Sequence, residues 1–321
     1  MIETTFFNTV QDRLLLVEEK IRSRADGHNP TLAAALNHLL TSGGKRIRVV
    51  VTLIAGKMVQ ADPDRLITLA AAIEALHTAT LVHDDLIDGA LIRRGIPTLN
   101  AQWSPAATVL TGDFIFAQAA KLAAETNSVP VMRLFSETLA TIVNGEITQL
   151  FSSKWTANRE DYYRRIYAKT ASLFETASAA AGLLAPVSDG DYELLRQYGY
   201  EIGMAFQMVD DILDFTGEQA TMGKPVAGDL RQGLITLPAI YYLEINPEDQ
   251  LLKKMLKSNF YEEEQIGSLL ESIRSSGAIE KSLEEAHRAV ARGLKALEKF
   301  PETSERRALE DLGRYIVERE I

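Results

Sequence analysis

The chain has 321 residues and a formal net charge of −10, with 46% hydrophobic and 24% charged residues. This is an ordinary globular composition, and the acidic balance excludes nucleic-acid binding driven by overall charge. The absence of cysteine excludes disulfides, thiolate metal sites and cysteine nucleophiles, but it leaves the compartment open. We find no signal-peptide pattern at the N-terminus and no unbroken apolar run near the ~18 residues of a membrane span. We therefore expect a cytoplasmic protein without a membrane segment.

Helix signals dominate the chain. Most prolines stand within two residues of a glycine, aspartate, asparagine or serine, and long segments rich in alanine, leucine, glutamate, arginine and isoleucine run between them. Strand signals are almost absent, and no repeat or linker divides the sequence. We predict a single all-α domain over residues 1–321. The longest break in helical character, residues 218–233, is predicted to be a functional loop over a site.

The first motif is SGGKRIR at residues 42–48. A glycine-rich turn before a helix offers free N–H groups and a favourable dipole to an anion. Lys45 and Arg48 lie three residues apart and can converge on one phosphate group. A Walker A loop is excluded, because it needs glycine and Ser/Thr where this chain has Leu39 and Arg46. Taken alone, the motif is more often a basic helix start than a binding site.

The next helical segment, residues 64–88, ends in LVHDDLID and is followed by Gly89. At helical spacing Asp84 and Asp88 share a face, with Asp85 beside them. Gly89 predicts the helix end, so the carboxylates fall in the last turn, where the helix dipole is unfavourable to negative charge. A cation must offset this repulsion, and Mg²⁺ suits a few carboxylates plus substrate phosphate oxygens.

The same pattern returns in QMVDDILDFTG, where Asp210, Asp211 and Asp214 precede Gly217. One DDxxD sequence alone is compatible with a solvated acidic helix end. Two copies, each with apolar flanks, are rarely accidental. We interpret both as Mg²⁺ sites.

Further candidates follow the aspartates in weaker patterns. Arg93 and Arg94 come directly after the first cluster, and arginine forks bind phosphate oxygens bidentately. His77 lies two helical turns before Asp84 and could donate to a phosphate or be a satisfied core histidine. His83 points about 100° away from Asp84 and is interpreted as structural. Four further residues are candidates for substrate contact, although none has a strong pattern by itself: Lys169, Thr170, Gln207 and Lys224.

In this order, GGKRIR, DDLID, IRRG, KT, FQMVDDILD and the GKP…GDL loop resemble the trans-isoprenyl diphosphate synthases, the head-to-tail polyprenyl synthases. The resemblance runs from about residue 35 onward. It implies one bundle of long antiparallel α-helices around a central apolar cavity, with the aspartate motifs facing each other across its mouth, in a homodimer. One departure is Val49, where the family often has a proline that carries no chemistry.

The resemblance also implies the role of each residue. The metal ligands for Mg²⁺ on the allylic diphosphate would be Asp84, Asp88, Asp210 and Asp214, with Asp85 and Asp211 in support. The same substrate would be contacted by Arg93, Lys169, Thr170, Gln207 and Lys224. The diphosphate of isopentenyl diphosphate would be held by Lys45, Arg48, His77 and Arg94.

Product length depends on the helix before the first motif. One turn before Asp84 lie Ala79 and Thr80, where family members that make short products carry bulky aromatics. Leu76 and a run of alanines continue this side of the helix, which we call its slim face because it carries few bulky side chains. We expect a medium-to-long product, beyond geranylgeranyl, with Phe135 or Leu139 as the floor.

Four alternatives remain open. One is a geranylgeranyl diphosphate synthase with a shorter product. A class I terpene cyclase shares an Asp-rich motif, but its second motif normally has an Asn/Ser/Glu pattern and it has no need for SGGKRIR. A non-catalytic partner subunit would be expected to lose aspartates, and none is lost here. The fourth alternative, a helical metal-binding protein without this activity, would leave the basic motifs unexplained.

Overall fold

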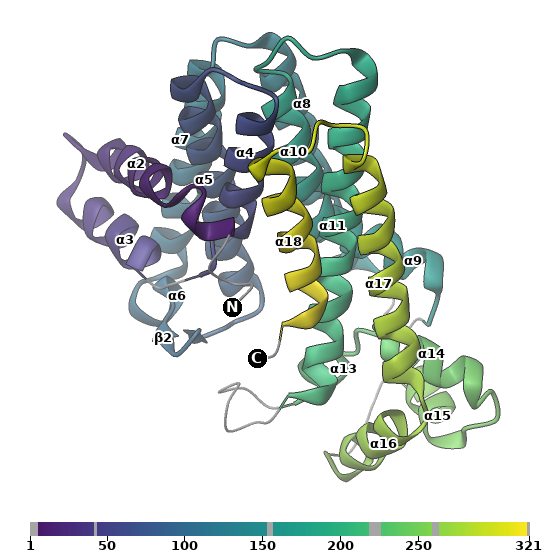
Figure 1. Cartoon of the computed structure of the whole chain (residues 1–321). Coiled ribbons are helices and arrows are strands. Elements are labelled where there is room, and N and C mark those ends of the chain that lie inside the picture. The colour runs from purple at the N-terminus through teal and green to yellow at the C-terminus, as the bar shows by residue number, and fades with distance from the viewer. Residues whose placement is uncertain (1–5, 42–43, 153–156, 218–225, 259–262, 320–321) are drawn as a thin grey trace. The chain divides into compact units, whose positions relative to one another are not determined.

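The computed structural model describes residues 6–41, 44–152, 157–217, 226–258 and 263–319. These are helical almost throughout, which confirms the predicted all-α fold class (Figure 1). A short hairpin of β1 (Ile92–Arg93) and β2 (Ile96–Pro97) follows the first aspartate motif. Strands of this length carry no alternating pattern, which is why sequence reasoning missed them.

The chain forms two compact units, each assembled from three chain segments. The first comprises Met1–Ala140, Leu173–Gly199 and Leu297–Leu312, and the second comprises Thr141–Ser172, Tyr200–Ala296 and Gly313–Ile321. The single domain expected for residues 1–321 stays a prediction.

In the first unit, α5 (Pro63–Ile87) packs against α4 (Ile47–Met58), α7 (Pro105–Glu125) and α2 (Gln11–Arg22). It is apolar round its whole circumference and buries most of its side chains, as a helix enclosed by neighbours does. Its start is fixed by Asp62, whose side chain accepts the N–H of Arg65 at 2.9 Å. The unit also contains η1 (Ser23–Ala25), α3 (Pro30–Thr41), α6 (Leu99–Gln102) and nearly all of α10 (Ser172–Gly182).

Within the described residues, α5 is also the candidate for a membrane span by length and composition. The polar residues scattered through it kept it from standing out as an unbroken apolar run. In the structure, 72% of its most apolar stretch is buried inside the protein. Core helices meet the same criterion, so this feature alone is weak support for a span.

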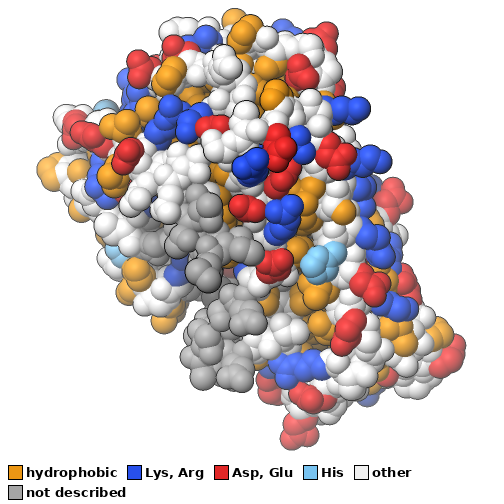
Figure 2. Space-filling model, in the orientation of Figure 1, with side chains coloured by type: hydrophobic (Ala, Val, Ile, Leu, Met, Phe, Trp, Pro, Cys, Tyr) orange, Lys and Arg blue, Asp and Glu red, His pale blue; other side chains and the backbone are white. Residues whose placement is uncertain are grey.

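The second unit contains α9 (Arg159–Ile166), the π-helical turn η2 (Tyr167–Ala171), α13 (Gly228–Arg231), α14 (Leu237–Ile245), α15 (Gln250–Ser258) and α16 (Glu263–Ser275). Tyr162, Met208, Phe215 and Leu237 belong to its buried core. Besides α10, whose Ser172 belongs to the second unit, the helices that contribute residues to both units are α8 (Val129–Phe151), α11 (Asp189–Thr216), α17 (Ala278–Leu297) and α18 (Ser304–Glu318). On the described part of the face in Figure 2, acidic and basic side chains are interspersed with apolar ones.

Candidate active site

The first aspartate motif occupies the end of α5, as the sequence predicts. Asp84 lies in the last helical turn, and Asp88 is the C-cap, with its N–H bonded to the Asp84 carbonyl at 2.8 Å. Gly89 follows with φ +65°, a left-handed conformation that suits glycine after a helix. Asp85 is buried, whereas Asp84 is partly exposed and Asp88 exposed. The helix therefore presents two accessible carboxylates and one internal carboxylate.

The internal carboxylate pairs with the hairpin. Arg93 Nε donates to Asp85 Oδ1 at 2.7 Å. The hairpin turns through Arg94 and Gly95, which both have positive φ, as a two-residue type I′ turn requires. His38 Nε2 lies 2.8 Å from the Pro97 carbonyl oxygen and anchors the far strand. Asp85 thereby orients Arg93, and its expected supporting role at the metal stays a prediction.

Two basic segments come together beside this motif. A Cβ placed on Gly44 would lie 2.3 Å from Nη1 of Arg94, so only a glycine lets the guanidinium approach the backbone here. Gly44 has φ +139°, a second reason for this residue. Lys45, exposed, follows directly. The geometry thus brings the SGGKRIR segment and the hairpin arginines into one basic cluster.

The two arginines of SGGKRIR have different roles, because Arg46 holds the segment in place and Arg48 belongs to the candidate site. Arg46 donates to the buried Glu74 and, at 2.7 Å, to the Leu40 carbonyl, so it anchors the segment to α5. Arg48 Nη1 lies 3.2 Å from His77 Nε2, and its guanidinium stacks 4.6 Å from the Phe174 ring centroid. Arg48 is therefore held rigid by two side chains, as a residue that positions an anion should be.

His77 has a lowered pKa. Its ring keeps some accessible surface, yet dense surroundings desolvate it and hold its pKa well below the usual range, and the nearby charge of Arg48 adds to this. Because an arginine can only donate, His77 Nε2 accepts and the proton of the neutral ring sits on Nδ1. His77 thus positions Arg48 and can donate only through Nδ1.

Acidification below about pH 6.5 is expected to destabilise the substrate-free protein through His77. The unfolded chain binds the proton first, because the folded-state pKa is the lower one. Stability is therefore lost as the pH falls from the unfolded pKa towards the folded pKa, and it is retained above the unfolded pKa. His77→Gln should show a shallower acid slope in urea denaturation between about pH 5 and about pH 7.5. The exposed His287→Gln is the control, and equal slopes for wild type and His77→Gln would refute the expectation.

His83 has the structural role that the sequence suggested. Its Nε2 lies 3.2 Å from the Val109 carbonyl and 3.4 Å from an Asp113 oxygen, both on α7. A Cβ on Gly112 would approach the ring to 2.3 Å, so a glycine here lets the ring lie this close to α7. His83 locks two helices together.

The second aspartate motif lies in the last turns of α11, again as predicted. Its middle member, Asp211, is buried and accepts from Tyr162 Oη at 2.7 Å and from Gln207 Nε2 at 2.8 Å. Thr170 Oγ1 donates to the other end of that amide, Gln207 Oε1, at 2.6 Å. Burial raises the pKa of both Asp211 and Tyr162 well above their ordinary values. Thr170 and Gln207 thus form a hydrogen-bonded chain into the motif.

The outer members of this motif have other partners. Asp214 accepts the N–H groups of Gly228 at 3.0 Å and Asp229 at 3.1 Å, which fixes the start of α13. Asp210 pairs with Arg319. Each of these carboxylates is partly exposed, and an oxygen that accepts one hydrogen bond retains a second lone pair. Both therefore keep capacity for a metal ion.

Lys169 and Thr170 lie in the π-helical turn η2. Wide turns of this kind occur frequently at functional sites. Lys169 Nζ is 3.1 Å from Glu146 Oε1, and both side chains are partly exposed. Lys224 and residues 218–225 of the predicted loop lie outside the described residues, whereas residues 226–233 are described and contain α13.

Asp229 is an acidic residue that sequence reasoning did not single out. Burial, together with the negative charges of Asp214 and Asp210, raises its pKa to about 6. Arg165 and Lys169 act in the opposite direction. The GDL sequence was noted only as part of a loop, and no local pattern showed that it returns to α11.

The arrangement suits a divalent metal that arrives with its substrate. Among the described residues, no group of three or more acidic, histidine or cysteine side chains forms a ready-made metal site. Mg²⁺ needs no such cage, because it binds through one or two carboxylates and takes its other ligands from water and phosphate oxygens. Asp84 with Asp88, and Asp210 with Asp214, offer these hard oxygen donors, so the residues present fit Mg²⁺.

The residues expected to set product length lie within the first unit. Ala79 and Leu76 are fully buried, whereas Thr80 is partly exposed and donates to the His77 carbonyl at 2.8 Å. On α8, Phe135 is 1% exposed and Leu139 is partly buried. The slim face of α5 is thus an interior surface, as a cavity wall must be.

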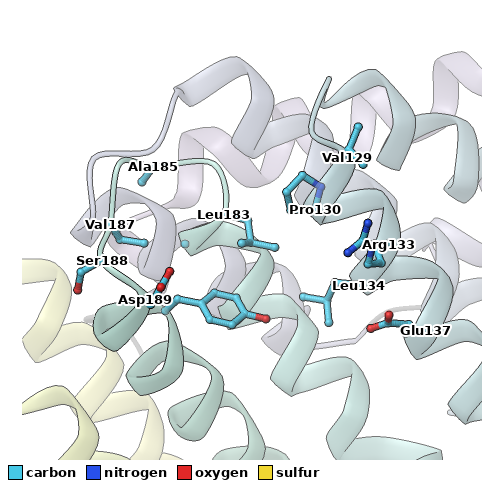
Figure 3. A pocket seen from close by; sticks show the side chains of 12 residues that line it. Val129, Pro130, Arg133, Leu134, Glu137, Leu183, Ala185, Val187, Ser188 and Asp189 are labelled. Carbon is cyan, nitrogen blue, oxygen red and sulfur yellow. The ribbon is translucent and has the colours of Figure 1, made fainter.

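A pocket of about 440 Å³ lies elsewhere in the first unit, between the first turns of α8, the end of α10 and the start of α11 (Figure 3). Arg133 and Glu137 lie on its α8 side, and Val187 and Asp189 lie across from them. None of the predicted site residues lines it. It is not part of the candidate active site.

Known proteins match the chain over almost its whole length. The polyprenyl synthetase family model matches residues 29–273. Heptaprenyl diphosphate synthase component 2 of Geobacillus stearothermophilus is 35% identical over 317 residues, which cover 98% of this chain and 98% of that protein.

Two solved structures have the same fold. A polyprenyl synthase from Caulobacter crescentus CB15, complexed with calcium and isoprenyl diphosphate, has a TM-score of 0.92 and 34% identity, and covers 99% of this chain and 98% of its own. A decaprenyl diphosphate synthase from Rhodobacter capsulatus has a TM-score of 0.91 and 31% identity, with 99% and 100% covered. The chain belongs to the polyprenyl synthetase family and is a prenyltransferase.

Proposed function

We propose that the chain condenses an allylic diphosphate with isopentenyl diphosphate, head to tail, to a medium-to-long all-trans polyprenyl diphosphate. The observation that carries this proposal is the placement of two DDxxD motifs, each in the last turns of a long helix. In each motif the middle aspartate is buried and bound by the protein, while the outer two keep accessible oxygens. Such a layout leaves carboxylates for metal ions on a diphosphate.

Mg²⁺ is the proposed metal. When bound, it neutralises charge on the allylic diphosphate and so favours departure of the leaving group. The ligands would be Asp84 and Asp88 in one motif and Asp210 and Asp214 in the other. The calcium and isoprenyl diphosphate bound to the Caulobacter relative support a divalent cation with this class of substrate.

The chain's own cations would act on the leaving diphosphate. Arg93, oriented by Asp85, and Lys169 would stabilise the negative charge that develops as the allylic C–O bond breaks, and Lys224 would do the same. The diphosphate leaves with the bonding electron pair, and the allylic carbocation must be kept from water. The residue 218–233 segment is the proposed cover.

The second substrate would bind at the basic cluster. Lys45, Arg48 and Arg94 supply positive charge for the diphosphate of isopentenyl diphosphate, and His77 fixes Arg48. Held there, the alkene attacks the cation and forms the new carbon–carbon bond. Loss of a proton then restores a double bond, and the departing diphosphate is the proposed base.

The proposed product is longer than geranylgeranyl. The side chains of α5 before Asp84 are small and mostly buried, which supports this, because small side chains obstruct a hydrocarbon in the interior less than aromatic ones would. The names of two relatives, a heptaprenyl and a decaprenyl diphosphate synthase, support it as well. Geranylgeranyl diphosphate is the shorter alternative.

The direct test is an assay of the purified chain with isopentenyl diphosphate and an allylic primer. Inorganic diphosphate should be released with Mg²⁺ and should fall to background with EDTA. The Geobacillus relative is named as one component of its synthase, so the chain is assayed alone. If the chain alone releases no inorganic diphosphate under any of these conditions, the result would favour a non-catalytic partner subunit.

We further propose that the chain forms a homodimer. On α8, Val143, Ile147, Leu150 and Phe151 recur at helical spacing and are 43%, 48%, 58% and 86% exposed. An apolar stripe of this kind supports burial against a second copy. Light scattering after gel filtration should give twice the mass of the 35.5 kDa chain. A monomer at all concentrations would contradict it.

A further inference from the structure

The carboxylate of Asp210 already has a cationic partner within the second unit. Arg319, which directly follows α18, donates from Nη2 to Asp210 Oδ1 and, at 3.0 Å, to the Phe206 carbonyl one turn earlier on α11. Its guanidinium carbon also lies 4.1 Å from the centroid of the Phe206 ring. Three contacts therefore direct this arginine to one aspartate.

The position of Arg319 is costly for a cation. Its side chain is 11% exposed, and its Nε is buried without a hydrogen-bond partner, whereas the Asp210 side chain is 42% exposed. Withdrawing a guanidinium from water is unfavourable unless a negative charge compensates. The compensating charge here is Asp210 and the acidic group around it.

That acidic group is crowded. Asp210 and Asp214 both raise the pKa of Asp229, and Asp229 in turn raises the pKa of the buried Asp211. The nearby cation Lys169 is paired with Glu146. Arg319 contacts Asp210 directly, at one of the two carboxylate oxygens that could bind a metal ion.

We propose that Arg319 is a built-in counter-ion that occupies Asp210 in the metal-free protein and is displaced when Mg²⁺ binds. The proposal rests on the proposed function, in which Asp210 is a metal ligand. Asp210 keeps a lone pair for the metal, but Mg²⁺ and the guanidinium would share its single negative charge and repel each other at this short distance, so the two cations compete. Metal binding at α11 is thereby coupled to release of Arg319, the residue that directly follows α18.

Competition has a thermodynamic signature. Removing Arg319 should destabilise the metal-free protein, because the aspartates lose their counter-ion, and it should tighten Mg²⁺ binding by about fivefold, as expected for a partly exposed ion pair. An arginine that only braces the fold would lower stability equally with and without metal. An arginine that helps to hold the metal would give weaker Mg²⁺ binding when removed.

The experiment measures thermal unfolding and calorimetric Mg²⁺ binding for wild type, Arg319→Gln and Arg319→Lys, with inorganic diphosphate present to supply the phosphate oxygens that complete the metal site. We expect Arg319→Gln to have a lower Tm in EDTA, a Tm equal to wild type in saturating Mg²⁺, and a Kd for Mg²⁺ lower by about fivefold. Arg319→Lys, which keeps the charge but loses the fork, should fall between. Arg288→Gln, on the exposed face of α17, is the control and should match wild type.

Each other outcome overturns the proposal. An unchanged Kd for Arg319→Gln, or a raised one, would refute competition while leaving the metal assignment intact. Absence of Mg²⁺ binding by wild type and all variants would contradict the assignment of Asp210 as a metal ligand, and the proposal would fall with it.

Discussion

Replacing Asp84 with asparagine is expected to lower kcat/KM for the allylic diphosphate by about 10²- to 10³-fold, the usual cost of one group that stabilises transition-state charge. The substitution keeps the shape of the side chain and removes its negative charge. Asp84 is partly exposed in the last turn of α5, so the fold should tolerate the change, and circular dichroism should be unaltered. The measurement is steady-state kinetics at several Mg²⁺ concentrations.

The matched control is Asp64→Asn on the same helix. Asp64 is exposed in the first turn of α5, at the end away from the motif. This variant should retain activity close to wild type. Activity of Asp84→Asn within a few-fold of the control would contradict a metal-binding role for the first motif.

Asp85→Asn serves as a comparison of a different kind. The neutral amide leaves Arg93 without its charged partner at 2.7 Å. The loss of activity should therefore arise through Arg93 and should be reproduced by removing that arginine, without a further loss in the double variant.

Replacing Ala79 with tyrosine is expected to shift the product distribution to shorter chains. Ala79 is fully buried on the slim face of α5, one turn before Asp84. A phenol ring there would block a hydrocarbon that grows along this face. Chromatography of the products of wild type and variant, made under identical conditions, measures the shift.

The stability of the variants provides a control for this prediction. If the ring enters an existing cavity, the stability of Ala79→Tyr should stay near that of wild type, whereas overpacking of a filled core costs about 1–3 kcal/mol. Ala70→Leu lies half a turn round the helix and is also fully buried. It should cost stability without changing product length. Equal product lengths for wild type and Ala79→Tyr would refute the proposal that this face of α5 lines the product cavity.

The sequence was informative where local rules apply. Helical spacing and the following glycines placed Asp84 and Asp214 in the last turns of their helices, and the structure confirms both positions. The interpretation of His83 as structural also agrees with its contacts to α7. The expected roles of the site residues stay predictions.

Other features depend on contacts between residues far apart in the sequence, which helical spacing cannot predict. Tyr162 reaches Asp211 across 49 positions of sequence, and Arg319 reaches Asp210 across 109. The π-helical turn at Lys169 interrupts a segment whose composition is simply helical. The hairpin after α5 is too short to alternate, so its role in returning Arg93 to Asp85 emerged only in three dimensions.

The central claim is a head-to-tail prenyl transfer that extends beyond geranylgeranyl. It is tested most directly by mass spectrometry of the products formed from geranyl diphosphate, excess isopentenyl diphosphate and Mg²⁺. We expect open-chain prenyl diphosphates longer than geranylgeranyl diphosphate. Cyclised hydrocarbons, or chains that end at farnesyl or geranylgeranyl, would contradict it.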